Sequence, residues 1–378
     1  MCIGCGACVR VCPQQPEHKV LGVIDGKAEL IGATDCIGHG ACRTACPMDA
    51  IKLVFGTSTR GVDIPILSPE FETNVPGIFI AGELGGMGLI RNALQQGSEA
   101  VNAITGRPRD NMDLDLVIVG AGPAGFSASL QAKANNLKCV TLEQDSLGGC
   151  VFQYPRGKVV MTTPAQLPLF GQVHFRNTTK EELLNFWLDV ERKTGVKINY
   201  QERVNSITNI DGGFVVSTSY GEYKTKNVLL AIGRRGTPRK LDVAGEDLPK
   251  VVYRMIDPEQ YAHQRVLVVG GGDSAIEAAV AISEITGTQV TLSYRGKAFD
   301  RAKAGNRKKL DAAVETGKID LRLESTVQSI DHDKIVLKQG DLVVEILNDS
   351  VIISAGGVLP NEFLRKVGIK IETKYGTL

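Results

Sequence analysis

Cysteine is the residue type whose spacing carries the clearest chemistry in this chain. Seven of the nine cysteines lie before residue 47, in two tight clusters. The first cluster has the spacing C-x2-C-x2-C-x3-C-P, and its members are Cys2, Cys5, Cys8, Cys12 and Pro13. The pattern returns 34 residues later with one histidine in a cysteine position, as Cys36, His39, Cys42, Cys46 and Pro47. Such closely spaced ligands favour metal thiolates in a reducing compartment over scattered disulfides.

The first cysteine run, which ends in Pro13, resembles the run with which bacterial two-cluster ferredoxins hold 4Fe-4S clusters. In that resemblance the fourth cysteine of each run crosses to the other cluster. The ligands that it implies for the first cluster are Cys2, Cys5, Cys8 and Cys46. Those that it implies for the second are Cys36, Cys42 and Cys12, with His39 in the remaining position. Zinc is the general alternative for a Cys/His set, but eight ligand positions in two such runs favour iron–sulfur clusters.

His39 is the departure from the ferredoxin pattern. An imidazole can bind iron, and nitrogen in place of a thiolate raises the potential of a cluster, as in Rieske centres. The alternatives are a 3Fe-4S cluster, or a fourth iron bound by solvent with His39 as a nearby donor. Met1 directly precedes Cys2 and leaves no residue to anchor the first loop, which is compatible with a natural chain that begins earlier.

A second kind of chemistry is indicated by the stretch Leu116–Gly125, LVIVGAGPAG. The glycines that fit G-x-G-x-x-G are Gly120, Gly122 and Gly125. They allow a tight turn, close approach of a pyrophosphate, and close packing of helix on strand. A further apolar run, Cys139–Leu142, ends in Glu143, where an acid that binds a ribose is expected. This context predicts a dinucleotide site, although an ordinary glycine-rich turn can show the same motif.

The stretch Val266–Ala275, VLVVGGGDSA, repeats this pattern 150 residues later. The matching positions are Gly270, Gly272 and, in place of the third glycine, Ala275. The strand expected over Gln289–Ser293 ends without an acid, and the basic residues that follow are Arg295, Lys297 and Arg301. A 2′-phosphate requires such cations, which favours NADP(H) over NAD(H). A solvated basic loop is the alternative, because Lys303–Lys309 is basic too.

The elements that must position these residues follow from periodicity and turn signals. We expect an N-terminal hairpin over Val20–Ile24 and Lys27–Ile31 with an Asp-Gly turn. Asn74–Ile104 reads as a buried strand, a loop and a helix, over Gly77–Ala81, Gly82–Gly88 and Leu89–Ile104. Later elements are a helix over Glu181–Val190 and Arg192 that carries Trp187, a hairpin over Asn205–Ile210 and Gly213–Ser217, and a buried strand over Val228–Gly233.

Asn74–Ile104 closely resembles the segment that ends the FAD domain in two-dinucleotide-binding flavoproteins, the family of thioredoxin reductase and related pyridine-nucleotide oxidoreductases. The resemblance implies that Glu83 bonds the ribityl chain in place of an aspartate and that the following helix directs its positive end at the flavin. In that family this segment comes last, whereas here it precedes Gly120. The chain end, Val367–Leu378, would also read smoothly into Ser68–Thr73. We therefore expect a circularly permuted FAD domain, with residues 106–113 as a polar linker.

The same resemblance implies the remaining cofactor contacts. Those for FAD are Gly120, Gly122, Ala124, Gly125, Glu143, Gly148, Gly149, Ala231, Gly233, Gly82, Glu83, Asn92 and Ala93. Those for NAD(P)H are Gly270, Gly272, Asp273, Ser274, Ala275, Arg295, Arg301 and Gly356. Hydride exchange requires no side-chain acid–base pair, so no catalytic residue is assigned. Cys150, which the resemblance places near the flavin, is interpreted as a small buried residue, with a reactive thiol as the alternative.

Length and composition limit the class of protein. A chain of 378 residues predicts two or three domains. A net charge of +1 predicts no special affinity for nucleic acid or a membrane surface. No apolar run reaches the ~20 residues that span a bilayer, and a signal-peptide h-region is absent, so the default compartment is the cytoplasm. The sequence leaves a homodimer open.

The expected fold class is α/β, with two Rossmann-like domains for FAD and NAD(P) and a small α+β ferredoxin module. The expected boundaries are 1–55 for a two-cluster ferredoxin domain, 56–110 for the permuted end of the FAD domain, 111–236 for the FAD-binding domain, 237–357 for the NAD(P)-binding domain and 358–378 for the return to the FAD domain.

This combination predicts an NAD(P)H-dependent oxidoreductase, because a flavin converts between the two-electron chemistry of nicotinamide and the one-electron chemistry of iron–sulfur clusters. Electrons would pass to or from a redox partner, a protein or a small molecule, in a direction that the sequence does not set. One alternative is a thioredoxin-reductase-like disulfide reductase, although the stretch Val251–Gln264, where that enzyme carries Cys-x-x-Cys, has no cysteine. Another is an electron-transfer subunit of a larger complex such as a 2-oxoacid oxidoreductase.

Overall fold

The computed structural model describes the chain apart from residues 13–14, 16–18, 33–35, 37–39, 53, 55–60, 87, 108–111, 155, 157–158, 161–164, 174–177, 235, 301 and 376–378. The chain forms two compact units. The first-fingerprint unit, which holds Gly120, is Val54–Gly236 with Leu359–Leu378. The second-fingerprint unit, which holds Gly270, is Thr237–Val358 grouped with Met1–Leu53. No helix among the described residues is both long and apolar enough to cross a membrane.

The first-fingerprint unit is built on a six-stranded sheet in the order β11-β12-β13-β5-β6, with β4 paired to β13. The strands are β4 (Ile78–Ile80), β5 (Leu114–Val119), β6 (Cys139–Leu142), β11 (Val204–Ile210), β12 (Gly213–Thr218) and β13 (Glu222–Leu230). β4, β13, β5 and β6 run parallel, while the β11–β12 hairpin joins β13 antiparallel. The buried apolar runs of β4, β5 and β13 are typical of a parallel sheet that is covered on both faces.

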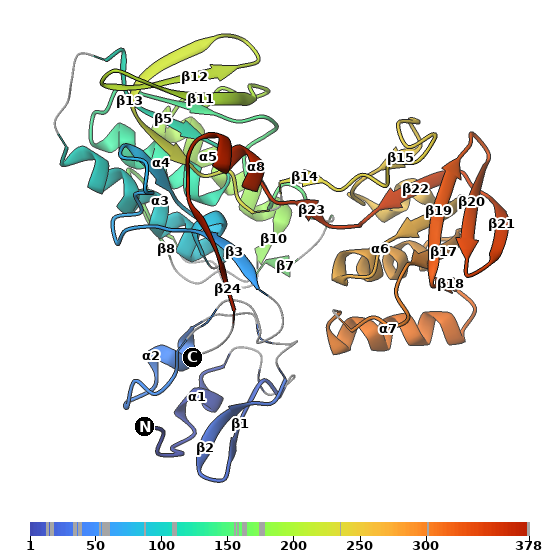
Figure 1. Cartoon of the computed structure of the whole chain (residues 1–378). Helices are drawn as coiled ribbons and strands as arrows, with labels where there is room; N and C mark the ends of the chain where they lie inside the picture. Colours follow the sequence, from blue (N-terminus) through green and yellow to red (C-terminus); the bar gives the residue numbers. More distant parts are fainter. Residues whose placement is uncertain are drawn as a thin grey trace. The chain divides into compact units, whose positions relative to one another are not determined.

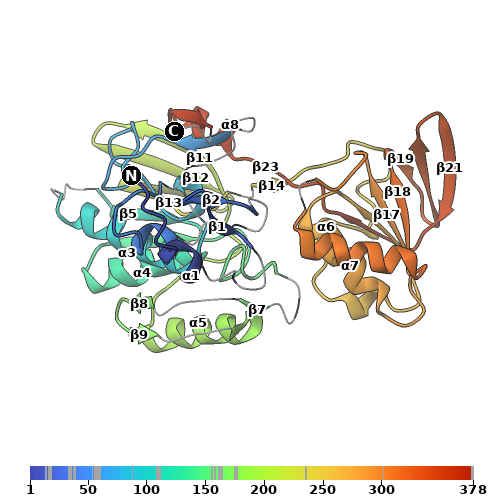
Figure 2. The ribbon, with the colours of Figure 1, turned by 90° about the horizontal axis from the view of Figure 1, so that it is seen from below.

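Two helices lie side by side on this sheet, α3 (Ile90–Thr105) and α4 (Pro123–Ala134) (Figures 1 and 2). A third, α5 (Lys180–Thr194), confirms the helix expected there. It begins at a capping box, in which the Thr179 side chain accepts from the N–H of Glu182 and the Glu182 side chain accepts from the N–H of Thr179. Trp187 on α5 is 1% exposed and packs against Phe126, with ring centroids 6.2 Å apart.

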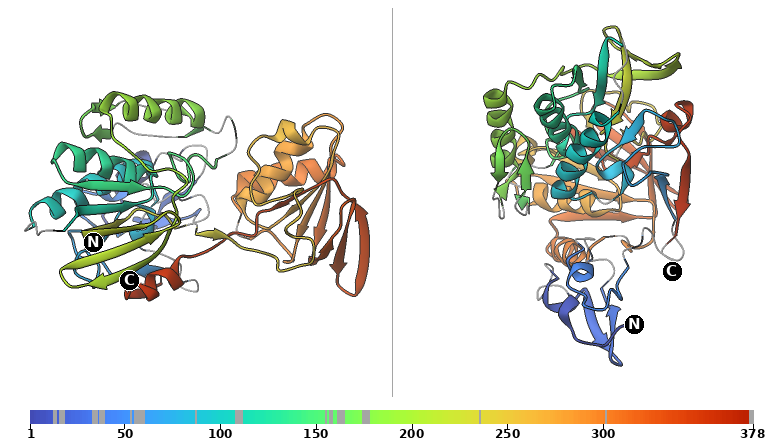
Figure 3. Two further views of the ribbon diagram at one scale, coloured as in Figure 1. Left: turned by 90° about the horizontal axis from the view of Figure 1, so that it is seen from above. Right: turned by 90° about the vertical axis from the view of Figure 1, so that its left-hand side faces the viewer.

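The out-of-order segment lies where the permutation predicts. β3 (Val62–Pro65) pairs antiparallel with β24 (Ile371–Lys374), and these two strands run side by side in Figures 1 and 3. The Asp63 carboxylate accepts hydrogen bonds from Asn361 Nδ2 at 2.8 Å and Thr373 Oγ1 at 2.7 Å. β4 then enters the sheet beside β13. The expected proximity of the chain end to residues 60–73 is confirmed over the described positions.

The strand expected over Val228–Gly233 is longer and ends earlier, because β13 runs from Glu222 to Leu230. Ala231 still donates its N–H to the Val119 carbonyl, but Gly233 has a φ of +64° and the chain turns there. The remaining elements of this unit are the 3-10 helix η2 (Glu83–Gly85), β7 (Val159–Val160), β8 (Ala165–Leu167), β9 (Gly171–Val173), β10 (Thr178–Thr179) and α8 (Asn361–Lys366).

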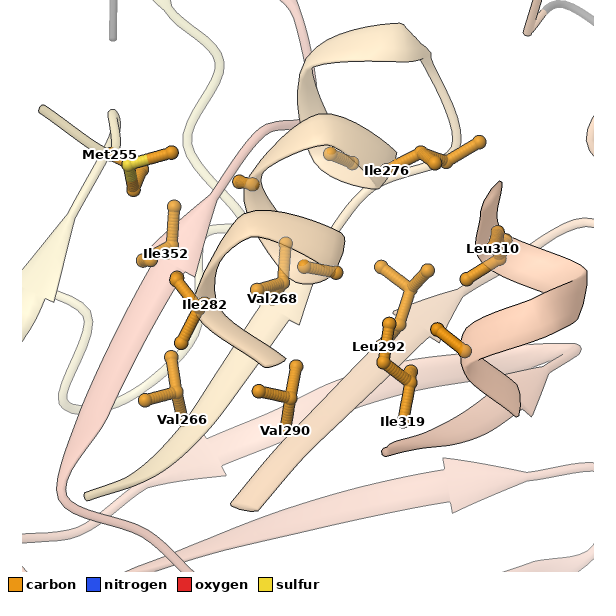
Figure 4. Packing of buried hydrophobic residues seen from close by; sticks show 14 of the residues in the cluster. Met255, Val266, Val268, Ile276, Ile282, Val290, Leu292, Leu310, Ile319 and Ile352 are labelled. Carbon is orange, nitrogen blue, oxygen red and sulfur yellow. The ribbon is translucent and has the colours of Figure 1, made fainter. Parts of the chain in front are cut away.

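The second-fingerprint unit contains a five-stranded parallel sheet in the order β15-β22-β16-β17-β18 and an antiparallel sheet β19-β20-β21. Its strands are β14 (Thr237–Pro238), β15 (Val251–Val252), β16 (Arg265–Val269), β17 (Gln289–Tyr294), β18 (Ile319–Leu323), β19 (Ser325–Ile330), β20 (Lys334–Gln339), β21 (Leu342–Leu347), β22 (Ser350–Ile353) and β23 (Gly357–Val358). Its helices are the 3-10 helix η3 (Pro258–Tyr261), α6 (Asp273–Ser283) and α7 (Ala304–Glu315). Figure 4 shows the core between them, where Val268 and Leu292 of the sheet lie beneath Ile276 of α6 and Leu310 of α7.

The N-terminal module contains two short helices and a hairpin. They are α1 (Ala7–Arg10), β1 (Leu21–Ile24), β2 (Lys27–Leu30) and α2 (Ala41–Thr44). Ile24 pairs with Lys27 across a two-residue turn in which Asp25 and Gly26 have φ values of 48° and 73°. Two consecutive positive φ angles are what an Asp-Gly hairpin turn requires. The predicted hairpin is confirmed.

Gly97→Ala should destabilise the first-fingerprint unit. A Cβ at Gly97 on α3 would overlap the Ala124 carbonyl oxygen on α4, so the two helices would have to separate. We expect a loss of about 1–3 kcal/mol in the free energy of unfolding, the range for an overpacked core. The single tryptophan, Trp187, lies in this unit, and its fluorescence reports the transition. Gly106→Ala at the end of the same helix is the control, since its Cβ would meet only the Ala103 oxygen, at 3.8 Å. Equal effects of the two substitutions would contradict the prediction.

Candidate cofactor sites

The first fingerprint lies between β5 and α4, and each of its positions is glycine for a different structural reason. Gly120 has a φ of +100°, and a Cβ there would lie 2.7 Å from the Ala231 carbonyl oxygen. A Cβ at Gly125 would overlap the Gly120 carbonyl oxygen, so only glycine lets the helix start this close to the strand. Gly122 is the N-cap of α4, and no side chain caps this end. The first N–H groups of α4 are thus left for an anion such as a pyrophosphate.

Glu143 directly follows β6, as the sequence predicts, and its side chain lies against the glycine turn. One oxygen of its carboxylate accepts the N–H of Ala121 at 2.7 Å, and the other accepts the N–H of Asp145 at 2.9 Å. The side chain is 6% exposed, and burial raises the pKa of Glu143 although these N–H groups act in the opposite direction. Since each carboxylate oxygen has more than one lone pair, Glu143 can hold the turn and still accept a hydroxyl group.

Three further glycine-containing turns meet the first fingerprint. Gly148 donates its N–H to the Ala121 carbonyl at 3.0 Å, and a Cβ at Gly149 would lie 3.1 Å from the Gly122 Cα. From the early segment, Gly82 has a φ of +87°, and a Cβ there would lie 3.0 Å from that of Ala124. Ala231, at the third turn, shares one buried cluster with Ala93 and Ala124. The structure therefore gathers residues from four parts of the chain into one cradle.

Two predicted residues of the early segment are only half-buried. Glu83 lies in η2, and its Cδ would be 2.8 Å from a Cβ at Gly88, so the side chain folds over that exposed glycine. Asn92 lies in the first turn of α3 and is half-buried. The backbone N–H of Gly82 is held by Gln96 Oε1 at 2.9 Å, a contact that sequence reasoning missed because it joins a loop to the second turn of the following helix.

The second fingerprint joins β16 to α6 and uses its glycines differently. Gly270 has a φ of +148°, and a Cβ there would crowd the Ser354 carbonyl. A Cβ at Gly272 would meet no atom within 4 Å, which leaves this side of the turn open to a ligand. Gly271, which the motif does not require, lies against the Tyr294 ring at the end of β17, and a Cβ would overlap it. Tyr294 in turn stacks on Phe299 with centroids 5.0 Å apart.

Asp273 binds protein groups at the start of α6. Its Oδ1 accepts the N–H of Lys303 at 2.8 Å and the Nδ2 of Asn306 at 2.8 Å. These bonds tie the first turn of α6 to the first turn of α7. Ser274 is exposed beside it and Ala275 is fully buried, in keeping with an alanine that replaces the packing glycine. The sequence placed Asp273 at the cofactor but gave no sign of these two partners.

The basic stretch after β17 is exposed at its described positions. Arg295 and Lys297 both face solvent, and Lys297 Nζ lies 3.7 Å from Glu324 Oε1. Arg301 lies outside the described residues. Gly356 has a φ of +85°, and its carbonyl accepts the N–H of Arg239 at 2.9 Å. The end of β17 thus carries no acid, and Arg295 forms no ion pair among the described residues.

Four thiols surround a cavity in the N-terminal module. Its empty volume is about 330 Å³ with open solvent included, and its sulfur-bearing lining residues are Cys2, Cys5, Cys8 and Cys46. The Ala28 N–H donates to Cys2 Sγ and the Ala50 N–H to Cys46 Sγ, each at 3.3 Å. The backbone N–H groups of Gly4 and Ala28 lower the pKa of Cys2, whereas burial raises the pKa of Cys8.

The arrangement of these thiols fits a cluster better than a single ion. Among the described residues, no three His, Cys, Asp or Glu side chains converge closely enough to hold one metal ion. In an iron–sulfur cubane each thiolate binds a different iron, so the four sulfurs stand around a volume instead of meeting at a point. The cavity therefore has the donor set and the open centre that such a cluster needs. Its four thiols are those that the ferredoxin resemblance assigns to the first cluster.

The second set of thiols is described in part. Burial raises the pKa of Cys42, and charge repulsion from Cys36 and Cys12 adds to the rise. Cys36 is exposed, and Cys12 and Cys42 are half-buried. His39 lies outside the described residues, so its expected ligation stays a prediction.

The two remaining cysteines differ in their surroundings. Cys150 is half-buried, which corrects the expectation of a small buried residue. Its Sγ would lie 3.8 Å from a Cβ at Gly233, because the thiol faces the turn that follows β13. Burial raises the pKa of Cys139 to about 12, so this thiol stays protonated at neutral pH.

Comparison with known proteins supports both halves of this description. Residues 117–378 match the family described as pyridine nucleotide-disulphide oxidoreductase, and residues 1–47 match the 4Fe-4S dicluster domain. The chain is 27% identical to bacilliredoxin reductase Bdr of Bacillus subtilis over 267 residues, 69% of this chain and 82% of that protein. It is 31% identical to a ferredoxin–NADP reductase of Acholeplasma laidlawii over 268 residues, 68% and 79% of the two chains. The bacillithiol disulfide reductase structure from Staphylococcus aureus matches with a TM-score of 0.59 at 26% identity, over 68% of this chain and 81% of that one.

Glu143→Gln should change how stability depends on pH in the protein stripped of nucleotide. The raised pKa means that the folded state holds the proton more tightly than the unfolded chain, so ionisation costs stability as the pH rises through the ordinary value of 4.5 and above it. The thermal midpoint of the variant should therefore gain on that of the parent between about pH 4 and pH 7. Glu99→Gln, at an exposed position on α3, is the control. A difference that stays constant with pH would count against the assignment.

Proposed function

Because the chain belongs to the pyridine nucleotide-disulphide oxidoreductase family and carries a 4Fe-4S dicluster domain, we propose that it is an NADPH-dependent FAD and iron–sulfur oxidoreductase that exchanges electrons with a one-electron carrier protein. The oxidoreductase class follows from the family. The choice of NADPH, the number of clusters and the carrier are the proposal. The observation that carries it is the presence in one chain of a dinucleotide cradle, a second open fingerprint and a four-thiol cavity.

We assign FAD to the cradle of the first-fingerprint unit. Bound FAD exchanges a hydride with nicotinamide and single electrons with iron–sulfur clusters, and so links the two kinds of carrier. The uncapped start of α4 holds the pyrophosphate, and Glu143 accepts a ribose hydroxyl while it keeps the Ala121 turn in place. Glu83 and Asn92, carried by the early segment, hold the ribityl side. The close packing of Gly82, Ala93, Ala124 and Ala231 excludes water from beneath the nucleotide.

We assign NADPH to the second fingerprint. Gly272 and Ser274 face the open side of the turn, where a pyrophosphate can reach the start of α6. Arg295, together with Arg301, takes the 2′-phosphate, for which the end of β17 offers no acid. Asp273 acts through Lys303 and Asn306, because its bonds fix the basic start of α7 beside this site.

We further propose two clusters in the N-terminal module. Cys2, Cys5, Cys8 and Cys46 hold the first, and the convergence of these residues on one cavity supports the assignment. Cys12, Cys36 and Cys42 hold the second, with His39 as its fourth ligand or with a 3Fe-4S composition. The assignment of clusters, FAD and NADPH to separate parts of the chain goes with the proposed domain boundaries after residues 55, 110, 236 and 357.

Disulfide reduction is the second candidate function, because the relatives include proteins named as bacilliredoxin and bacillithiol disulfide reductases. Outside the two cysteine clusters the chain has only Cys139 and Cys150, which are too far apart in sequence for Cys-x-x-Cys. The raised pKa of Cys139, about 12, makes it a poor nucleophile. A Cys-x-x-Cys dithiol of the kind that thioredoxin reductase uses is thus absent outside the two cysteine clusters, which favours electron transfer.

An anaerobic titration of the reconstituted protein with NADPH tests the proposed function. We expect flavin absorbance to bleach first and the EPR signal of at least one reduced cluster to follow, because hydride must pass through the two-electron carrier before single electrons leave. The reduced protein should then reduce a free ferredoxin or a viologen far faster than thioredoxin or a small disulfide.

Two outcomes of this titration would overturn the proposal. Efficient disulfide turnover that survives loss of the clusters and Cys150→Ser would establish the reductase function instead. A flavin that stays oxidised with both NADPH and NADH would indicate a subunit that works only in a larger complex.

Arg295→Ala should weaken NADPH binding and leave NADH binding nearly unchanged. A charge-assisted bond to the 2′-phosphate contributes about 1.5–3 kcal/mol, which is about a tenfold or larger rise in Kd for NADPH. Lys338→Ala removes an equal charge from an exposed position on β20, outside the basic stretch, and is the matched control. Equal losses for both nucleotides, or for both variants, would reduce the basic loop to general surface charge.

A further inference from the structure

The four-thiol cavity has an apolar rim that is exposed to solvent. Ile3 and Met48 both line it, and they are 61% and 46% exposed. Ile3 precedes α1 and Met48 follows α2, so the rim is formed by residues from the two ends of the module's sequence. Cys5, which lies between Ile3 and α1 in the sequence, is itself exposed. Two of the residues that line the cavity are thus large apolar side chains that reach solvent.

Exposing large apolar side chains to water costs free energy, and a binding partner that covers them removes this cost. Met48 is unbranched and adaptable, the side-chain type that is enriched in the buried centre of protein interfaces. Residues 1–53 contain five lysines and arginines and five aspartates and glutamates, so their side chains give the module no net charge that would attract a partner. A partner that binds at this rim therefore makes apolar contacts around the exposed thiol of Cys5.

We propose that the rim formed by Ile3 and Met48, here called the Ile3–Met48 rim, is the docking surface for a single-electron carrier protein whose own redox centre opens on an apolar surface. The inference rests on the proposed function, since the rim borders the thiols assigned to the first cluster. Ile3 and Met48 exclude water from the contact and hold the carrier against Cys5, so that one electron crosses in each encounter without any bond being made or broken. One NADPH supplies two electrons and leaves NADP⁺ and a proton, so two carrier molecules are each reduced by one electron.

The test compares two double variants of the full-length, reconstituted protein. Ile3→Asn with Met48→Gln makes the rim polar without adding charge. Val23→Asn with Leu30→Asn makes an equal change on the β1–β2 hairpin, at side chains that are 43% and 54% exposed and do not line the cavity. Binding is measured by calorimetry with a bacterial ferredoxin whose iron is replaced by gallium, which binds without accepting an electron. Electron transfer is measured separately with the native ferredoxin and with methyl viologen.

We expect the rim variant to bind gallium ferredoxin at least tenfold more weakly than the parent and to reduce native ferredoxin at least tenfold more slowly at low carrier concentration. Because Ile3 and Met48 line the cluster cavity, each rate is divided by the reduced-cluster EPR signal of the same variant. The ratio of ferredoxin reduction to viologen reduction should then fall at least tenfold in the rim variant, and the hairpin variant should match the parent throughout.

Three results would overturn the inference. The rim variant could bind the carrier as the parent does, or both double variants could lose binding equally. The rim variant could instead lose NADPH-driven cluster reduction, which would assign the rim to electron entry from the flavin. Failure of the proposed function is a separate result, because clusters that stay oxidised in the NADPH-treated parent would refute it whatever the gallium ferredoxin binding shows.

Discussion

The approach of α3 to α4 is the contact on which the dinucleotide cradle depends. At Gly97 the two helices are so close that a single methyl group would overlap the Ala124 carbonyl. Since α3 comes from the segment before the fingerprint, this contact carries Gly82 against Ala124 and completes the cradle. An ion pair holds the far end of the segment, where Arg107 lies 2.6 Å from Glu72 and stacks over the Phe79 ring. The hydrogen bond from Arg107 lowers the pKa of Glu72, so the pair stays ionised at neutral pH.

The same constraint explains why a different chain order is compatible with one fold. A parallel sheet needs its strands beside one another and its helices on its faces, whatever their order along the chain. Here β4 pairs with β13, and β24 pairs with β3, so the chain end and the early segment close on each other. Asp63 strengthens this closure, because its carboxylate binds Asn361 and Thr373 while its carbonyl accepts from Arg234 at 2.7 Å. Three segments that are distant in sequence are thus fixed at one residue.

Sequence alone could predict whatever depends on local pattern. The motif glycines, the Asp-Gly hairpin, the helix over α5 and the place of Glu143 follow from turn geometry and periodicity, and each is found as expected. What it could not predict depends on contacts between distant residues. Gly271 is glycine because of the Tyr294 ring, and Asp273 binds residues about 30 positions away. Cys150 is half-buried, and its Sγ faces Gly233 in the turn after β13, which is distant in sequence.

The two acids beside the fingerprints show how one motif can be stabilised in two ways. Glu143 binds the N–H of the glycine turn itself, so the turn is held by the residue that we propose as the acceptor of a ribose hydroxyl. Asp273 binds the start of the next helix, so the second fingerprint is held through the basic segment that follows β17. In the first case burial raises the pKa of the acid, and a bound hydroxyl would replace part of the hydration that the carboxylate has lost. In the second case the acid is bonded to Lys303 and Asn306, and the exposed Arg295 follows β17 without an acid at the strand end. The two fingerprints therefore differ mainly in the hydrogen-bond partners of their acids. Glu143 binds the glycine turn, whereas Asp273 binds the start of α7.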